Sequence, residues 1–159
     1  KLWLGDDEKT QALNFLKLQY FLKCYEDDFF KMSGRKRDEM EWCEFYSQRD
    51  IEGMRNEIVN GDEDVWYYLP SGHRYALISS GRTIELRIGK STNDPVKIAN
   101  YLKFVLGIVE NIKNVPFEKC YCIGKVTKLV PNEVMTYWRN AGCFLNTKAI
   151  ETRGVTLNA

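Results

Sequence analysis

The stretch that decides the predicted fold runs from Val65 to Ile88 and reads VWYYLPSGHRYALISSGRTIELRI. Apolar and polar residues alternate within its short runs, which is typical of strands that have one buried face. Two turn sequences, Pro70-Ser71-Gly72 and Ser80-Gly81, separate the runs and suit tight reversals of the chain. The stretch therefore predicts three short antiparallel strands, over residues 65–69, 73–79 and 82–88.

Helical spacing of apolar residues is found on both sides of this stretch. The clearest helix start is Asp94-Pro95, because Asp is a good N-cap and Pro fits the first helical position. The buried face of that helix is predicted to hold Ile98, Leu102, Val105, Val109 and Ile112. In chain order, the sequence predicts helices over 6–32 and 38–59, the three strands, a helix over 94–114, a strand over 120–130, a helix over 131–142 and a strand over 150–157.

The predicted order of elements is thus α-α-β-β-β-α-β-α-β. Because tight turns join the consecutive strands, the sheet is predicted to be mainly antiparallel and the class to be α+β. The sheet would consist of the three-stranded meander over 65–88 and one or two later strands. Helices are predicted to pack against one of its faces.

Length and composition favour a single domain over residues 1–159. The chain has 159 residues, of which 44% are apolar and 28% charged, a composition that can bury a core. Since residue 1 is Lys, we expect the domain to have been excised from a longer protein. No run approaches the roughly 18 consecutive apolar residues of a membrane span, so no contact with a membrane is predicted.

Charge is distributed unevenly along the chain. Residues 1–63 contain ten Lys and Arg against 15 Asp and Glu, whereas residues 64–130 contain ten against five. The sequence therefore predicts an acidic helical part over 1–60 and a basic α/β part over 64–159. Such asymmetry bears on the choice of partner rather than on the fold.

The five cysteines are an odd number, so they cannot all pair within the chain. Free thiols are typical of reducing compartments, and we expect the protein to be intracellular, in the cytoplasm or the nucleus. Cys120 and Cys122 would share one face of a strand, which leaves open a zinc site completed by Cys24, Cys43 and Cys143. No two cysteines are separated by two to four intervening residues, the arrangement common in zinc sites. No metal and no cofactor is therefore predicted.

The second hairpin suggests a register. If Ser80-Gly81 is a two-residue loop, Leu77 pairs with Ile84 and Arg74 with Arg87. The outer face of the sheet would then hold two aromatic, four basic and one acidic side chain: Trp66, Tyr68, Arg74, Arg82, Glu85, Arg87 and Lys90. Like charges placed opposite each other are destabilising, so either acidic groups of the leading helices cover this face or it is open and binds an anion.

An open face with paired arginines and flat aromatics suits phosphates and bases. The predicted function is therefore a non-enzymatic module that binds nucleic acid, as RNA or a single strand, through this face. One alternative is a protein-interaction or assembly domain that uses the aromatic-rich helices of residues 7–59.

A second alternative is a metal-dependent nuclease or cap-binding domain of a larger polymerase-type protein. Glu85-Leu86-Arg87 with Asp64 would serve the nuclease, and Trp66, Tyr68 and Glu85 would hold a methylated base. Activity as an enzyme is not favoured, since the sequence contains no P-loop, G-x-G-x-x-G or G-x-S-x-G motif. His73 is the only histidine, so any histidine-based catalysis would depend on it.

Overall fold

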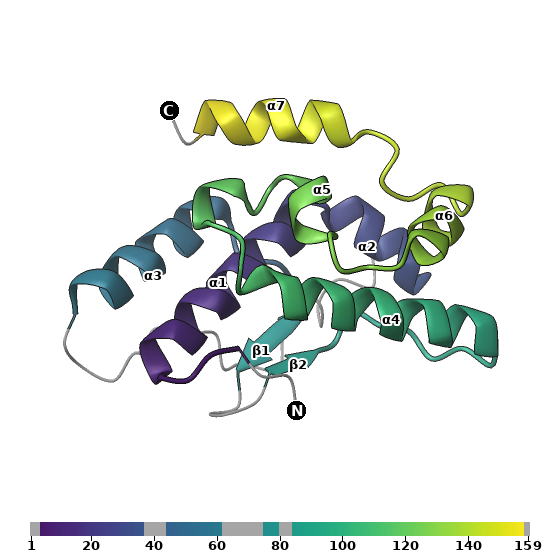
Figure 1. Cartoon of the computed structure of the whole chain (residues 1–159), viewed down its shortest axis with the longest axis horizontal. Coiled ribbons are helices and arrows are strands. Elements are labelled where there is room, and N and C mark those ends of the chain that lie inside the picture. The colour runs from purple at the N-terminus through teal and green to yellow at the C-terminus, as the bar shows by residue number, and fades with distance from the viewer. Residues whose placement is uncertain (1–3, 37–43, 62–74, 80–83, 158–159) are drawn as a thin grey trace.

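The computed structural model describes residues 4–36, 44–61, 75–79 and 84–157, with side chains up to residue 153. Within these residues the chain is mainly helical, and α3 and α4 extend toward opposite ends of the molecule (Figure 1). The elements are α1 (Glu8–Cys24), α2 (Glu26–Ser33), α3 (Gln48–Asn60), β1 (Leu77–Ser79), β2 (Ile84–Leu86), α4 (Pro95–Ile112), η3 (Phe117–Lys119), α5 (Ile123–Val126), α6 (Asn132–Asn140) and α7 (Thr147–Leu157).

The predicted α+β class is wrong. In the described part of the chain, the only strands with a partner strand are β1 and β2, which form a two-stranded antiparallel sheet. The predicted strand 65–69 lies outside the described residues. The other predicted strands, 120–130 and 150–157, are not strands but helical turns and α7.

The error at residues 120–130 has a physical cause. The buried apolar residues there include Ile123, Val126 and Val130, whose spacing of three and four residues is helical rather than alternating. Thr127 adds a hydrogen bond from its hydroxyl to the Ile123 carbonyl, at 2.7 Å. At residues 150–157, the β-branched side chains favour a strand only weakly, and tertiary context overrides such a preference.

The predicted helices correspond better to the structure. Asp94 is the N-cap of α4, with Pro95 as its first residue, and α6 forms within the range predicted for it. The predicted helix 6–32 is divided at Tyr25 into α1 and α2. Of the predicted helix 38–59, residues 44–47 are described but are not helical, and α3 begins only after Ser47. The Ser47 hydroxyl accepts a hydrogen bond from the Asp50 amide at 3.2 Å.

The central helix is α1, which packs against α2, α3 and α4. Buried residues occur around much of its circumference, and most are aromatic or aliphatic. Its buried Gln19 donates a hydrogen bond to the Leu77 carbonyl at 2.8 Å, which attaches the small sheet to α1. Among the described residues, no helix combines the length and the apolar character that crossing a bilayer requires.

A cluster of buried aromatic rings joins α1, α2, α4 and the segment after α6. Phe29 lies edge-on to Phe21, Phe104 and Phe144, with centroid distances of 6.0, 6.0 and 6.2 Å. Phe104 and Phe144 stack at 5.3 Å. Edge-to-face and stacked pairs add to the stability that burial itself provides.

The turn that contains Phe144 is stabilised by the buried side chain of Asp28. Phe144 has a φ of 58°, a backbone conformation that non-glycine residues seldom adopt. Its amide donates a hydrogen bond to Asp28 Oδ1 at 2.8 Å. Burial raises the pKa of Asp28, although this hydrogen bond and the nearby Lys31 act in the opposite direction.

The Asp28→Asn variant is expected to become more stable relative to the wild type as the pH rises. Because the pKa of Asp28 is higher in the folded state than its ordinary value of 3.8, the stability that protonated Asp28 provides is lost as the pH rises through the folded-state pKa. Asparagine keeps an oxygen that accepts the Phe144 hydrogen bond and has no charge. Urea unfolding of both proteins between about pH 4 and pH 8 measures the difference. The role of Asp28 is contradicted if the free energy of unfolding of the variant minus that of the wild type stays constant or falls as the pH rises.

Candidate functional site

The register of the hairpin differs from the predicted one by two residues. Leu77 pairs with Leu86 and Ser79 with Ile84. Four residues therefore lie between the last pair of the two strands, whereas the predicted loop, Ser80-Gly81, has two. A shift of two keeps each side chain on its predicted face, because the side-chain period of a strand is two. The predicted pairings Leu77–Ile84 and Arg74–Arg87 are therefore wrong, but the division of residues between the two faces is retained.

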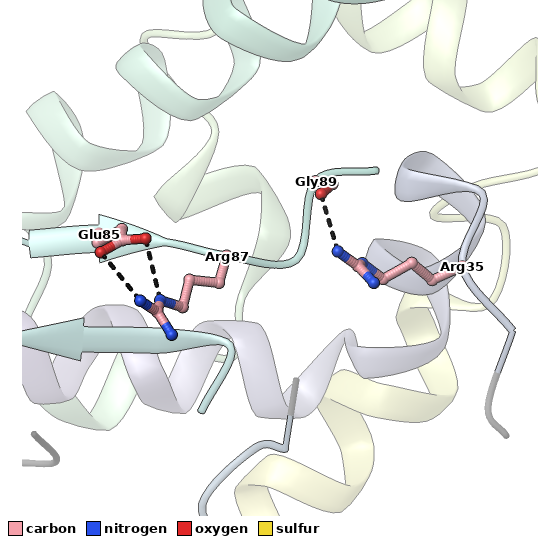
Figure 2. Close-up of polar contacts among 4 residues, drawn as sticks. All are labelled: Arg35, Glu85, Arg87 and Gly89. Atoms are coloured by element: carbon pink, nitrogen blue, oxygen red, sulfur yellow. Dashed lines mark hydrogen bonds and ion pairs between the residues drawn. The ribbon is translucent and has the colours of Figure 1, made fainter. Parts of the chain in front are cut away.

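Arg87 lies opposite Ala76 in this register, and its amide donates a hydrogen bond to the Ala76 carbonyl at 2.7 Å. Its guanidinium pairs with Glu85, on the same strand face, with Nε 3.0 Å from Oε1 (Figure 2). Within the described residues, a counter-charge for Arg87 thus comes from the neighbouring position on the strand. This ion pair weakens the case for Arg87 as a phosphate ligand.

Four residues of the predicted nucleic-acid face lie outside the described residues: Trp66, Tyr68, Arg74 and Arg82. Their part in binding stays a prediction, as do the nuclease and cap-binding alternatives that need Asp64, Trp66 and Tyr68. Of the described members, Glu85 and Arg87 are engaged with each other. Lys90 lies beyond the end of β2, beside a cavity.

This cavity has a volume of about 360 Å³ and lies between the end of α2, the segment after β2 and the first half of α4. Ser33 and the buried Met32 come from α2, residues 89–92 from the segment, and Lys97, Ile98, Tyr101 and Leu102 from α4. The lining thus combines apolar and aromatic side chains with two ammonium groups and several hydroxyls.

Arg35 stabilises one wall of the cavity, the one formed by the segment after β2. It comes from the turn after α2, which Gly34 makes possible by adopting a φ of 73°. Its guanidinium donates a hydrogen bond to the Ile88 carbonyl at 3.1 Å. A second hydrogen bond runs to the Gly89 carbonyl at 3.3 Å (Figure 2). The segment after β2 is therefore attached to the end of α2 by a charged donor, which makes stronger hydrogen bonds than a neutral one.

An apolar stripe continues from the cavity along α4. It consists of Ile98, Leu102 and Leu106, which are 42%, 54% and 56% exposed. Because residues four apart lie one above the other on a helix, these three side chains form one line. The prediction that Ile98 and Leu102 belong to the buried face is wrong. Val105, Val109 and Ile112 are buried as predicted, together with Phe104 and Ile108.

Lysines flank this stripe, defined as Ile98, Leu102 and Leu106. At about 100° per residue, Lys97 and Lys103 project on opposite sides of it. Within the described chain, neither ammonium has a carboxylate within salt-bridge distance. The carboxylates of α4 and its cap are already engaged: Asp94 Oδ1 accepts from the Val96 amide at 2.9 Å, and Glu110 pairs with Lys113 at 2.8 Å.

Several aromatic residues of the helices to which one alternative assigned partner binding, residues 7–59, belong to the core. Phe15, Tyr20, Phe21 and Phe29 are all fully buried and belong to the hydrophobic core. They are therefore inaccessible to a partner of the folded chain. The exposed apolar residues that lie in one line, and that sequence reasoning missed, are on α4. The available signal was that its apolar residues outnumber those that one buried face can hold.

Three of the described cysteines are thiols with strongly raised pKa values. Burial raises the pKa of Cys24 and of Cys120 to about 12 and that of Cys143 to about 11, so these thiols stay protonated at neutral pH. Within the described ranges, no three His, Cys, Asp or Glu side chains are grouped to hold a metal ion. Cys43 lies outside those ranges.

Comparisons of the chain with protein-family models, with curated proteins and with solved structures found no match. What the chain binds must therefore be inferred from its own surface. In the part of the chain that the structure describes, the cavity, the stripe and the lysines around them are the features from which we argue.

Proposed function

We propose that the chain is a protein-interaction module that binds an amphipathic, acidic helix of a partner protein along α4. The observation that supports this most directly is the exposure of Ile98, Leu102 and Leu106 in one line. Single exposed apolar side chains are ordinary, whereas a contiguous apolar patch rimmed by polar residues marks a binding surface. This surface takes the place of the helices of residues 7–59 in the interaction hypothesis.

The shape of the stripe favours a helical partner. From Ile98 to Leu106 the helix rises about 12 Å, which is two turns. Apolar residues at positions i, i+4 and i+7 of a second helix span a similar distance, about 10.5 Å, and this is the usual pattern of helix recognition in a groove. A partner helix packed here would remove all three exposed side chains of the stripe from water.

The charge around the stripe favours an acidic partner. Lys97 and Lys103 flank it, and Lys90 lies at its end beside the cavity. Complementary charge raises association rates and suppresses wrong partners. We place this interaction inside the cell, because the four described cysteines are free thiols, as in reducing compartments.

Binding of single-stranded nucleic acid is a second proposal, favoured by the cations Arg35, Lys90 and Lys97 around the cavity. The two proposals differ in their response to salt. Phosphate contacts release counterions, so nucleic-acid affinity falls steeply between about 50 and 200 mM salt. An interface dominated by apolar side chains loses much less.

The Leu102→Asp variant is expected to lose at least about tenfold in affinity for an acidic helical peptide, because a carboxylate then replaces the central side chain of the stripe. The probe is a fluorescent synthetic peptide of about 18 residues, with leucines at i, i+4 and i+7 and glutamates elsewhere on its surface, measured by anisotropy. A short oligouridine is titrated in parallel.

Leu129→Asp is the matched control. Leu129 is 49% exposed and precedes Val130, which faces α4 at Gly107, on the side away from the stripe, so this variant should bind the peptide like the wild type. Equal binding by wild type and Leu102→Asp, or no saturable peptide binding at all, contradicts the interaction proposal. Salt-sensitive binding of oligouridine without binding of the peptide would favour the nucleic-acid proposal instead.

A further inference from the structure

The cavity and the stripe form one continuous surface. Ile98 and Leu102 belong to both, so an apolar segment lying along the stripe has its end at the mouth of the cavity. The volume of about 360 Å³ lies at the lower end of the roughly 300–1,000 Å³ typical of ligand sites. It is a space for one bulky side chain rather than for a large cofactor.

The chemistry of the walls favours an aromatic side chain. The apolar part of the wall comes from Met32, which is itself fully buried, and from Ile98 and Leu102. Tyr101 adds a ring from α4, which is able to stack with a second ring or meet it edge-on. Buried aromatic anchors in pockets provide most of the affinity of many interfaces.

The polar rim favours carboxylates next to that anchor. Lys97 reaches from α4 toward the end of α2, where its Nζ lies 3.4 Å from the position that a Cβ on Gly34 would occupy. Lys90 belongs to the wall formed by the segment after β2, whose backbone Arg35 holds in place. The two lysines therefore come from different elements of the lining.

We infer that the cavity is the anchor pocket of this surface: it takes one aromatic side chain of the partner helix, and Lys90 and Lys97 pair with carboxylates that flank this anchor. The inference rests on the proposed interaction along the stripe and specifies its partner. Arg35 serves as a positioning residue, since it holds the wall and does not itself line the pocket.

Truncation of the anchor tests the pocket. Two acidic peptides are compared that differ only in having tryptophan or alanine at the position expected to meet the cavity. The wild-type chain should bind the tryptophan peptide at least about tenfold more tightly. The Gly89→Leu variant, in which the added side chain points toward Tyr101, should narrow the pocket and remove this preference while still binding the alanine peptide.

Reversal of charge tests the rim. The Lys90→Glu/Lys97→Glu variant should prefer a peptide with lysines at the positions flanking the anchor, whereas the wild type prefers glutamates there. The double variant Lys128→Glu/Lys148→Glu, at two exposed positions outside the cavity and the stripe, makes the same change in net charge and is the control. It should keep the wild-type preference.

The outcomes separate this inference from the proposed function. If Leu102→Asp abolishes binding but tryptophan and alanine peptides bind equally well, the stripe binds a helix and the cavity is not its anchor pocket. If charge reversal leaves the preference for glutamates unchanged, the assignment of Lys90 and Lys97 is wrong. If Leu102→Asp has no effect, the proposed function itself fails.

Discussion

Replacing Phe29 with alanine is expected to lower the free energy of unfolding by about 3–5 kcal/mol. The Phe29 side chain is fully buried, and its ring contacts those of Phe21, Phe104 and Phe144. These rings belong to α1, α4 and the segment after α6, so the cavity left by truncation would weaken contacts among several elements at once. Urea unfolding followed by circular dichroism measures the loss.

The matched control for this prediction is Leu145→Ala. Leu145 follows Phe144 directly but is 64% exposed, so its truncation should change the free energy of unfolding by no more than about 0.5 kcal/mol. A Phe29→Ala variant that loses less than about 1 kcal/mol would show that the ring cluster is not the centre of the core.

Gly107→Ala is expected to destabilise the protein by about 1–3 kcal/mol, although alanine favours a helix by about 1 kcal/mol over glycine. A Cβ at Gly107 would lie 2.7 Å from Val130 Cγ2 and 3.0 Å from Val130 Cα. The latter atom belongs to the backbone, so the contact cannot be relieved by a rotation of a side chain. Either α4 or the segment that contains Val130 has to move.

The same substitution at Gly53 should have the opposite sign. Gly53 lies inside α3, and a Cβ there would meet nothing within 4 Å. Gly53→Ala should therefore raise the free energy of unfolding by about 0.5–1 kcal/mol. Thermal and urea unfolding of both variants measure the two effects, and stabilisation by Gly107→Ala would contradict the close packing of α4 on Val130.

The ends of helices could be predicted from the sequence where a capping residue specifies them. Asp94-Pro95 specifies the start of α4 through the geometry of its own backbone, and Asp94 caps it as expected. Ser33-Gly34 similarly ends α2, with Gly34 in the left-handed conformation. Such signals depend on a few neighbouring residues and not on what the helix packs against.

The strands and the site depended on distant contacts. The register of the hairpin was inferred from Ser80-Gly81, but Ser79 pairs with Ile84, so the turn dipeptide did not set the loop length. Arg35 illustrates the same difficulty: its hydrogen bonds to Ile88 and Gly89 span more than fifty residues. No pattern within the turn after α2 indicates them.

The exposed stripe is an intermediate case. Ile98 and Leu102 have the spacing of a buried face, and periodicity alone cannot say which of two apolar faces is turned toward the core. The structure settles this by burying Phe104 and Ile108. The side chains of the stripe then remain exposed to solvent, and this exposure is the reason for proposing a partner.

The most direct test of the central claim, that α4 is a binding surface, is an NMR titration of the isotope-labelled chain with the acidic tryptophan peptide. We expect the largest changes in backbone amide resonances on residues 89–106, which include the stripe and most of the cavity lining. The Leu102→Asp substitution should remove these changes. Saturable changes confined to α3, to the β1–β2 hairpin or to α7, or the absence of any change, would contradict this claim.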